Sequence, residues 1–277
     1  MDGELRAPWE RLLSAIRALG PLAVAFSGGV DSTLLLHAAH EALGGDVLAV
    51  TASSPVVPRR DAGDALAFCR EEGVEQLVVD VGVLELEGFA SNPEERCYLC
   101  KREMLSRLSR ASAARGFPRL AEGSNADDAS AWRPGFQAVR EAGAASPLMD
   151  AGLAKADVRA IARAEGLVAW DKPASSCLAT RFPHGALLTQ EGLALVDRAE
   201  DAVRALGFSQ VRVRVAGCEE GVPTAARVEV GAVEVKRLLE EPARSKLDEA
   251  LRGLGFEEVE VDRGGYRMGS MEGAARS

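Results

Sequence analysis

The sequence lacks any long apolar run. No stretch approaches the roughly 18 consecutive apolar residues that a membrane-spanning helix needs. Its first residues, Met1–Glu4, are acidic, whereas a secretory signal peptide begins with basic residues and continues with an apolar segment. Internal repeats and low-complexity tracts are absent as well. We therefore expect a globular, cytoplasmic protein with no membrane partner.

Cysteine is scarce, and basic residues are outnumbered. The five cysteines are an odd number, and in a reducing compartment they favour thiol or metal chemistry over a disulfide framework. The 33 Lys and Arg face 42 Asp and Glu, which gives a net charge of -9. This balance argues against a broad nucleic-acid-binding face but leaves room for a local basic pocket. A small molecule is the expected ligand.

The 277 residues, 47% of them hydrophobic, suffice for two modest domains. In the first, predicted over residues 1–182, short β-branched apolar runs alternate with longer helical patterns. The expected strands are 22–26, 46–51, 76–81, 119–122 and 146–148, and the expected helices are 5–19, 31–43, 59–72, 97–115 and 155–165. This order predicts an α/β fold, a doubly wound parallel sheet that binds ligands beyond the carboxyl ends of its strands.

The pattern changes after residue 190 and predicts a smaller α+β domain over residues 183–268. Its expected elements are helix 190–206, strands 210–216 and 226–231, helix 233–252 and strand 257–262. Strict alternation in Val211–Val215 places Arg212 and Arg214 on one face of a strand. That face is either solvated or a site for an anion. We expect the small, polar tail 269–277 to be disordered.

A phosphate site is predicted at Ser27–Ser32, which reads Ser-Gly-Gly-Val-Asp-Ser between an apolar strand and a helix. Glycines allow a tight turn there, and the first N–H groups of the following helix point at an anion. The run lacks both the Gly-Lys-Ser/Thr ending of a P-loop and the Gly-x-Gly-x-x-Gly of a dinucleotide fold. It resembles the PP-loop of ATP pyrophosphatases, which split ATP between its α- and β-phosphates. The expected binding residues are Ser27, Gly28, Gly29, Asp31 and Ser32.

A second polar group, Glu122–Asp128, follows strand 119–122 and is therefore expected at the same sheet edge. Gly123 and Asn125 suit contacts with ribose or adenine, and the carboxylates, Asp128 among them, suit Mg²⁺. Alone, this composition also fits an ordinary loop. Three basic residues are weaker candidates for contacts with pyrophosphate or AMP: Lys101, Arg133 and Lys155.

Three cysteines stand in chemically suggestive positions. Cys97 and Cys100 form a Cys-x-x-Cys at a helix start, which brings both sulfurs within one turn. Cys177 follows two serines and precedes Arg181, whose charge would favour a thiolate that acts as nucleophile, sulfur donor or metal ligand. The other two are less informative: Cys69 is expected as a small buried hydrophobe, and Cys218 follows Gly217 in a turn. His37 and His40 lie in the expected helix 31–43 and are expected to pack or to face water.

Taken together, these segments resemble the LarE-type sulfur transferases over nearly the whole chain. The motifs that carry the resemblance are Ser27–Ser32, Gly123–Asp128, Arg133–Gly135, Ser146–Leu148 with Lys155–Arg159, Trp170–Pro173, Cys177–Arg181 and Gly265–Ser270. The resemblance implies nickel-pincer nucleotide cofactor synthesis. ATP and Mg²⁺ would adenylate a carboxylate of pyridinium-3,5-biscarboxylic acid mononucleotide, and sulfur would then replace its oxygen. Homo-oligomers, possible hexamers among them, belong to the same expectation.

Two sulfur sources occur among such enzymes. In one branch the enzyme sacrifices its own cysteine, and in the other three cysteines hold a [4Fe-4S] cluster whose fourth iron carries the sulfide. Cys97, Cys100 and Cys177 match the cluster branch. Sacrifice of Cys177 alone is the second hypothesis, and a zinc site completed by His184 is the third.

Guanidinium groups match carboxylate and phosphate oxygens, so arginines are expected to bind the phosphorylated dicarboxylate. The candidates for this contact are Arg181, Arg212 and Arg214. Glu200 and Glu229 could act as acid or base, although helix 190–206 carries so many charges that a solvated face is the favoured interpretation for Glu200. Rival functions are a PP-loop amidating ligase, a tRNA thiolase and a nucleotide sensor without turnover. An amidating ligase would need a source of ammonia, a tRNA thiolase would need a basic surface, and a sensor would not convert ATP to AMP.

Overall fold

The computed structural model describes residues 3–129 and 134–267, and these residues form two compact units. The first unit runs to Val81 and resumes over Glu95–Ser175; the second comprises Gly82–Glu94 and the chain from Ser176 onward. Arg133 and the tail 269–277, both singled out in the sequence, lie outside the described residues. The packing divides the chain after Ser175. The predicted bounds of the first domain were 1–182.

The first unit is built on a parallel sheet in the order β3-β2-β1-β4. Its strands are β1 (Leu22–Ala25), β2 (Val47–Ser53), β3 (Gln76–Asp80) and β4 (Arg119–Ala121). The interior strands β1 and β2 are almost fully buried, as their unbroken apolar runs predict for a sheet covered on both faces. Strand order reverses between β1 and β4, so the carboxyl ends of these two neighbours form the switch point at which such sheets bind ligands.

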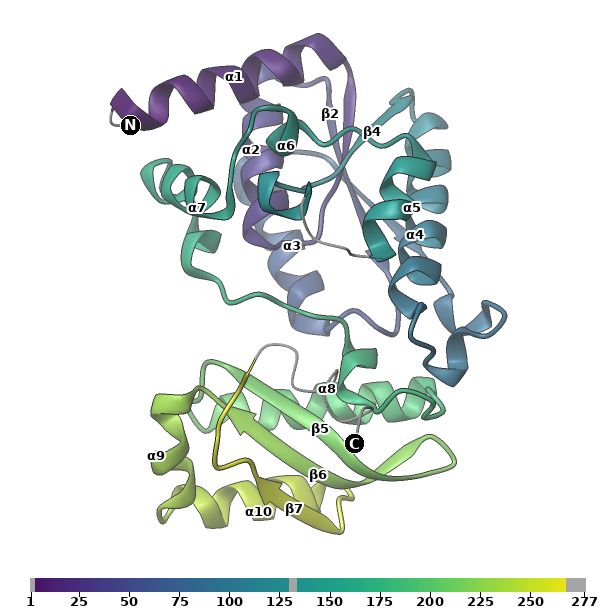
Figure 1. Ribbon diagram of the computed structural model, residues 1–277, viewed down its shortest axis with the longest axis vertical. Helices are drawn as coiled ribbons and strands as arrows, with labels where there is room; N and C mark the ends of the chain where they lie inside the picture. The colour runs from purple at the N-terminus through teal and green to yellow at the C-terminus, as the bar shows by residue number, and fades with distance from the viewer. Residues whose placement is uncertain (1–2, 130–133, 268–277) are drawn as a thin grey trace. The chain divides into compact units, whose positions relative to one another are not determined.

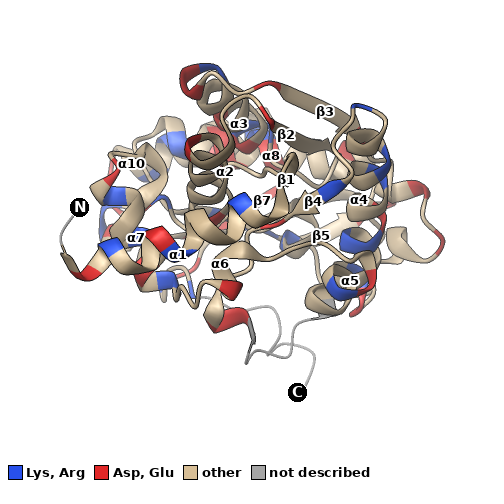
Figure 2. Ribbon diagram, turned by 90° about the horizontal axis from the view of Figure 1, so that it is seen from above, with Lys and Arg blue, Asp and Glu red and all other residues tan. Residues whose placement is uncertain are grey.

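Helices cover both faces of this sheet (Figure 1). On one side lie α1 (Gly3–Leu19), α2 (Val30–Leu43), α3 (Arg59–Glu72) and α7 (Lys155–Ala164), and on the other lie α4 (Arg96–Ala113) and α5 (Pro134–Ala142). The short α6 (Pro147–Asp150) packs near α1. The predicted α/β fold with a parallel sheet is therefore confirmed. Figure 2 shows acidic and basic residues interspersed along these helices.

Two local predictions in this unit were wrong. Segment 146–148, expected as a strand, begins α6, and its neighbour Ala145 makes only an isolated parallel bridge to Ala121. Pro147 explains the difference, because proline has no N–H for a sheet and its fixed φ suits the first turn of a helix. Helix α5 was not predicted at all; its run after Pro134 is short, although it buries Ala138 and Val139.

The second unit contains a three-stranded sheet in the order β5-β6-β7, in which β5 and β6 are antiparallel and β6 and β7 are parallel. The strands are β5 (Val211–Glu219), β6 (Val222–Val230) and β7 (Glu258–Val261). Three helices accompany the sheet: α8 (Gln190–Ala205), α9 (Val235–Leu239) and α10 (Ala243–Gly253). Apolar residues of α8, α9 and α10 pack with those of the strands in one core, which confirms a separate small sheet in the C-terminal part.

The single helix expected over 233–252 is instead two helices, α9 and α10. The break falls at Glu240–Pro242, where Glu240 has an extended backbone (φ -88°, ψ 150°). A proline restricts the residues before it and cannot continue a helical hydrogen-bond ladder, which accounts for the interruption.

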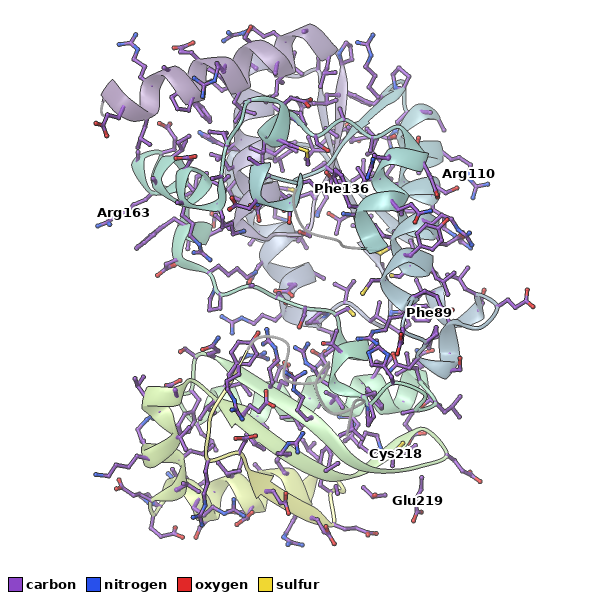
Figure 3. All side chains as sticks on the ribbon, in the orientation of Figure 1. Phe89, Arg110, Phe136, Arg163, Cys218 and Glu219 are labelled. Atoms are coloured by element: carbon purple, nitrogen blue, oxygen red, sulfur yellow. The ribbon has the colours of Figure 1, made fainter. Side chains whose placement is uncertain are left out.

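Segment 82–94 joins the second unit through a buried asparagine. Asn92 lies in the left-handed region at φ 50° and is fully buried. Its Nδ2 donates hydrogen bonds to the carbonyls of Phe182 (3.2 Å) and Pro183 (2.7 Å), directly after the 3₁₀ turn η5 (Leu178–Arg181). Phe89, labelled in Figure 3, is buried in the same segment. This insertion therefore supports the turn that follows Cys177.

Candidate active site

The loop Ser27–Ser32 closes on itself between β1 and α2. Ser32 Oγ donates to Gly29 O (3.0 Å) and accepts from Ser27 N (3.3 Å), while the two serine hydroxyl oxygens lie 3.1 Å apart. Gly28 adopts φ 69°, a left-handed conformation that disfavours a side chain. The loop is thus fixed by its own serines, and the amides at the start of α2 have the arrangement that favours an anion.

The second polar group packs directly against this loop. A Cβ on Gly123 would lie 3.0 Å from Ser32 N and 3.2 Å from Asp31 Cβ. Only a glycine lets the chain after β4 approach the first turn of α2 so closely. The predicted meeting of the two loops at one sheet edge is therefore a feature of the fold.

Asp31 is held at the centre of these contacts. Asn125 Nδ2 donates to Asp31 Oδ1 (3.1 Å), and Lys155 Nζ forms an ion pair with the other carboxylate oxygen. The backbone N–H of Lys155 donates to Asp127 Oδ2 (2.9 Å), and Asp128 Oδ2 accepts from Asn125 N (3.1 Å). The structure thus brings together all nine residues expected to bind the nucleotide: Ser27, Gly28, Gly29, Asp31, Ser32, Gly123, Asn125, Asp128 and Lys155.

One cation beside the loop was not singled out by the sequence analysis. Lys172 Nζ donates to Gly28 O (3.3 Å) and pairs with Asp61 (3.1 Å) and Asp64 (2.8 Å) at the start of α3. Lys172 therefore brings a positive charge to the glycine turn from a segment far along the chain. Lys172 lies in the motif Trp170–Pro173, but a lysine before a proline is not a sequence pattern that predicts a contact with the glycine turn.

The buried Glu122 pairs with Lys101, whose side chain is partly exposed. Lys101 Nζ lies 3.2 Å from Glu122 Oε2, and Glu122 Oε1 accepts from Ser124 N (3.0 Å) and Ser146 Oγ (2.8 Å). Burial acts to raise the pKa of the Glu122 carboxyl, but the Lys101 charge and these hydrogen bonds outweigh it and lower the pKa overall. Because all its acceptor atoms face protein donors, Glu122 positions the loop and Lys101, which is one residue beyond Cys100.

We predict that Gly123→Ala weakens ATP binding by about tenfold, or about 1.4 kcal/mol, because the added methyl group must push the first turn of α2 out of place. Isothermal titration of the full chain with Mg·ATP measures the dissociation constant. The control is Gly45→Ala, where a Cβ meets nothing within 4 Å. Equal affinities for the two variants would contradict the role assigned to this close approach.

The five cysteines all lie in the described part of the chain, and none forms a disulfide. Cys97 and Cys100 occupy the first turn of α4 in the first unit; Cys97 is exposed and Cys100 half-buried, with its thiol 3.3 Å from Met104 Sδ. Cys177 begins the 3₁₀ turn η5 in the second unit and is half-buried.

The remaining two cysteines fit a structural role. Cys69 is buried, as predicted, and burial raises the pKa of its thiol to about 11. Cys218 lies at an irregular step of the β5–β6 hairpin, next to Glu219 (Figure 3).

Arg181 is fully buried, and its guanidinium N–H groups donate hydrogen bonds to other groups of the protein. Its Nε and Nη2 donate to the two oxygens of Glu200 (2.7 and 3.2 Å), and its Nη1 donates to the carbonyls of Ser176 (2.9 Å) and Cys177 (3.1 Å). The guanidinium therefore fixes the backbone that carries the Cys177 thiol. In this geometry Arg181 is a positioning residue.

Glu200 is buried, so the expectation of a solvated face was wrong. It accepts from Arg181, from Arg204 Nη2 (2.8 Å) and from the backbone N–H of Val213 (3.2 Å) in the edge strand β5. Burial acts to raise the pKa of Glu200, but the Arg181 charge and hydrogen bonds, with Arg212 and Arg204 adding to them, lower it overall. An ionised carboxylate thus organises this part of the second unit.

Arg212 and Arg214 do project from one face of β5, and that face is covered: the residues are 6% and 5% exposed. A solvated face is therefore excluded for both. Arg214 pairs with the buried Glu229 (3.1 Å) and donates to Thr180 O (2.9 Å). The Arg212 guanidinium lies 5.2 Å from the centre of the Tyr266 ring, and burial together with the neighbouring Arg181 charge lowers its pKa despite Glu200.

Known proteins support the resemblance. The chain is 36% identical to the pyridinium-3,5-bisthiocarboxylic acid mononucleotide synthase of Lactiplantibacillus plantarum over 261 residues, or 94% of this chain and 92% of that protein. An uncharacterised protein of Synechocystis sp. is 36% identical over 96% of this chain and 97% of its own. A further uncharacterised protein, from Methanocaldococcus jannaschii, is 27% identical over 69% of this chain and 72% of its own.

No protein-family model matches the chain. In the part of the chain that the structure describes, no helix is both long and apolar enough to cross a membrane. Because 36% identity extends over nearly the full length of both proteins, the chain belongs to the family of the Lactiplantibacillus plantarum synthase, the LarE-type family that its motifs resemble.

Proposed function

We propose that this protein is an ATP-dependent sulfur transferase that converts a carboxylate of pyridinium-3,5-biscarboxylic acid mononucleotide into a thiocarboxylate. One observation carries the proposal: a closed Ser27–Ser32 loop with Asp31 gripped by Asn125 and Lys155, in a chain that is 36% identical to a named bisthiocarboxylic acid mononucleotide synthase. The reaction belongs to the synthesis of a nickel-pincer cofactor.

In the first step Mg·ATP binds at the switch point of the first unit. A substrate carboxylate oxygen attacks the α-phosphorus, the bond to the β-phosphate oxygen breaks, and pyrophosphate leaves. The amides at the start of α2 and the Lys172 charge beside Gly28 stabilise the charge that develops on pyrophosphate. Asp31, Asp127 and Asp128, whose carboxylates share the partners Asn125 and Lys155 at this edge, would hold Mg²⁺.

In the second step sulfur attacks the activated carbonyl carbon and AMP leaves with the former carboxylate oxygen. We propose Cys97, Cys100 and Cys177 as ligands of a [4Fe-4S] cluster, which when bound supplies the sulfide. The donor set suits such a group: two thiols one helical turn apart, a third beside buried arginines, and no disulfide among them. Sacrifice of the Cys177 sulfur, without a cluster, remains the alternative.

Substrate anions require cations in the second unit. We propose Arg212 and Arg214 as the contacts, since a guanidinium suits both carboxylate and phosphate oxygens. Because both residues are buried, the face that carries them would have to open for the substrate to reach it. Arg181 keeps the Cys177 segment in place through Ser176 and Cys177.

The homo-oligomer and the cytoplasmic location that the family resemblance implies remain predictions. Light scattering on the purified protein measures the oligomeric state.

The test is ATP turnover by anaerobically reconstituted protein, measured as AMP and pyrophosphate with and without the pyridinium dicarboxylate nucleotide. We expect AMP formation that depends on this nucleotide and a product heavier by one oxygen-to-sulfur exchange. Iron and acid-labile sulfide analysis distinguishes the two sulfur sources. Turnover to ADP would contradict the adenylation step, and the absence of any turnover would favour a nucleotide sensor.

A further inference from the structure

A second constellation of ligating side chains lies in the first unit, away from the phosphate loop. His37 and Glu41 stand one turn apart in the second half of α2, and Glu165 directly follows the end of α7. One ligand atom from each of these three residues lies within 4.8 Å of the other two. Helices α2 and α7 pack side by side in Figure 1. A fourth residue, Glu72 at the end of α3, contacts His37 from the side.

The orientation of the His37 ring is fixed. Its Nδ1 lies 2.6 Å from Glu72 Oε1, and because a carboxylate only accepts, Nδ1 carries the proton. The Trp9 ring stacks on the imidazole with the ring centres 6.1 Å apart. The lone pair of Nε2 is thereby directed to the side away from Glu72, where Glu165 lies. A histidine held in this way by a carboxylate is typical of metal ligands.

The space between these atoms has the dimensions of a coordination site. His37 Nε2 and Glu165 Oε2 are 3.7 Å apart, too far for a good hydrogen bond. Two bonds to zinc, each of about 2.0–2.2 Å, span at most about 4.4 Å, so one ion reaches His37 Nε2 and Glu165 Oε2 without backbone movement. The ligand atom of Glu41 lies within 4.8 Å of both, and this exposed side chain reaches the same ion by a small change of rotamer. The Glu41 and Glu165 carboxylates, which meet beside one imidazole nitrogen, repel each other, and a divalent cation among them removes the repulsion.

We propose that His37 Nε2, Glu41 and Glu165 bind a divalent transition-metal ion of the zinc type, with Glu72 positioning the His37 ring. One imidazole with two carboxylates suits such an ion better than Ca²⁺ or Mg²⁺, which prefer oxygen ligands alone. His37 and Glu165 are partly exposed, at 20% and 25%, so the ion can enter from solvent. The ion would join the far ends of α2 and α7, whose near ends hold Asp31 and Lys155.

Zinc titration of the full chain, with bound metal counted by a competing chromophoric chelator, tests this site. The wild-type protein should bind one equivalent more than His37→Gln, since the cysteines are the same in both. Glu72→Gln should keep the stoichiometry but weaken this site by about 10–100-fold, as expected for the loss of a carboxylate that orients a ligating histidine. The matched control is His40→Gln, one turn along the same helix and near the same Glu72 (3.5 Å), which should retain the equivalent.

Thermal unfolding gives an independent measurement, because an ion that binds only the folded chain raises Tm. Zinc should raise the Tm of wild type and of His40→Gln more than that of His37→Gln. Should His37→Gln not fold, the exposed Glu41→Gln replaces it. Equal stoichiometry in wild type, His37→Gln and Glu41→Gln would overturn the proposal and leave a second proton on His37 as the explanation of the cluster. ATP turnover plays no part in these measurements, so their failure leaves the proposed sulfur transfer untouched.

Discussion

Cys177→Ala should lower thiocarboxylate formation by at least about a thousandfold, the scale expected when an enzyme loses the group that attacks its substrate. Both sulfur sources need this thiol, one as the donor and the other as a ligand. The ATP loop lies in the other compact unit and contains no cysteine, so its contacts should survive the change. The variant should therefore still release pyrophosphate in a burst and accumulate the acyl-adenylate. Product mass spectrometry and a pyrophosphate assay on the same samples measure both steps.

The Cys97→Ser and Cys100→Ser variants then separate the two sulfur sources. With a cluster, each should lose iron and sulfur transfer together, because three protein ligands are needed. With a sacrificial cysteine, both should stay active, and the spent enzyme should lose the mass of one H₂S at residue 177. Cys218→Ser, in the hairpin of the second unit, is the control and should behave as wild type. Unchanged thiocarboxylate formation in Cys177→Ala would overturn both hypotheses.

The meeting of Ser27–Ser32 and Glu122–Asp128 at one sheet edge was predictable because its determinants are local. A strand, a glycine turn and a helix start are consecutive in Ala25–Thr33, and parallel strands bring the next polar group to the same edge. The contacts of Asp31 were less predictable. Asn125 and Lys155 were expected to bind the nucleotide, but only the packing shows that both contact Asp31. Lys172 could not be placed at all, since its contact with Gly28 joins segments that no periodicity relates.

In the second unit, by contrast, the sequence did not predict which charged residues are buried. Alternation in Val211–Val215 correctly put Arg212 and Arg214 on one face of a strand, yet it could not tell whether water or protein covers that face. The covering groups come from η5 and α8, which precede the strand, and Glu200 appeared as one charge among many on its helix. Hydrophobic patterns report which face of an element is apolar, and they carry no information on buried ion pairs.

The free energy of unfolding should fall by about 3 kcal/mol in Arg181→Met. Removing one partner of a buried ion pair typically costs about 3–5 kcal/mol, because an uncompensated charge stays inside the protein. Glu200 would keep Arg204, and Val213 N–H would still donate to it, which favours the lower end of that range. Urea unfolding followed by circular dichroism at neutral pH measures the change. Arg244→Met is the control: its partly exposed pair with Asp248 should be worth less than about 1 kcal/mol.

The pH dependence of this loss identifies its cause. Since the folded-state pKa of Glu200 is lower than the ordinary value of 4.5, its ionised form contributes stability above that value, and the contribution disappears as the pH falls through the lowered pKa. Without Arg181 that pKa moves up, so the gap between wild type and Arg181→Met should narrow on acidification. The double variant Arg181→Met/Glu200→Gln should recover much of the loss at neutral pH, because the buried Glu200 charge is removed together with its partner Arg181. A loss that neither acid nor the double variant reduces would mean that the packing of the Arg181 side chain, and its hydrogen bonds to Ser176 and Cys177, stabilise the unit instead.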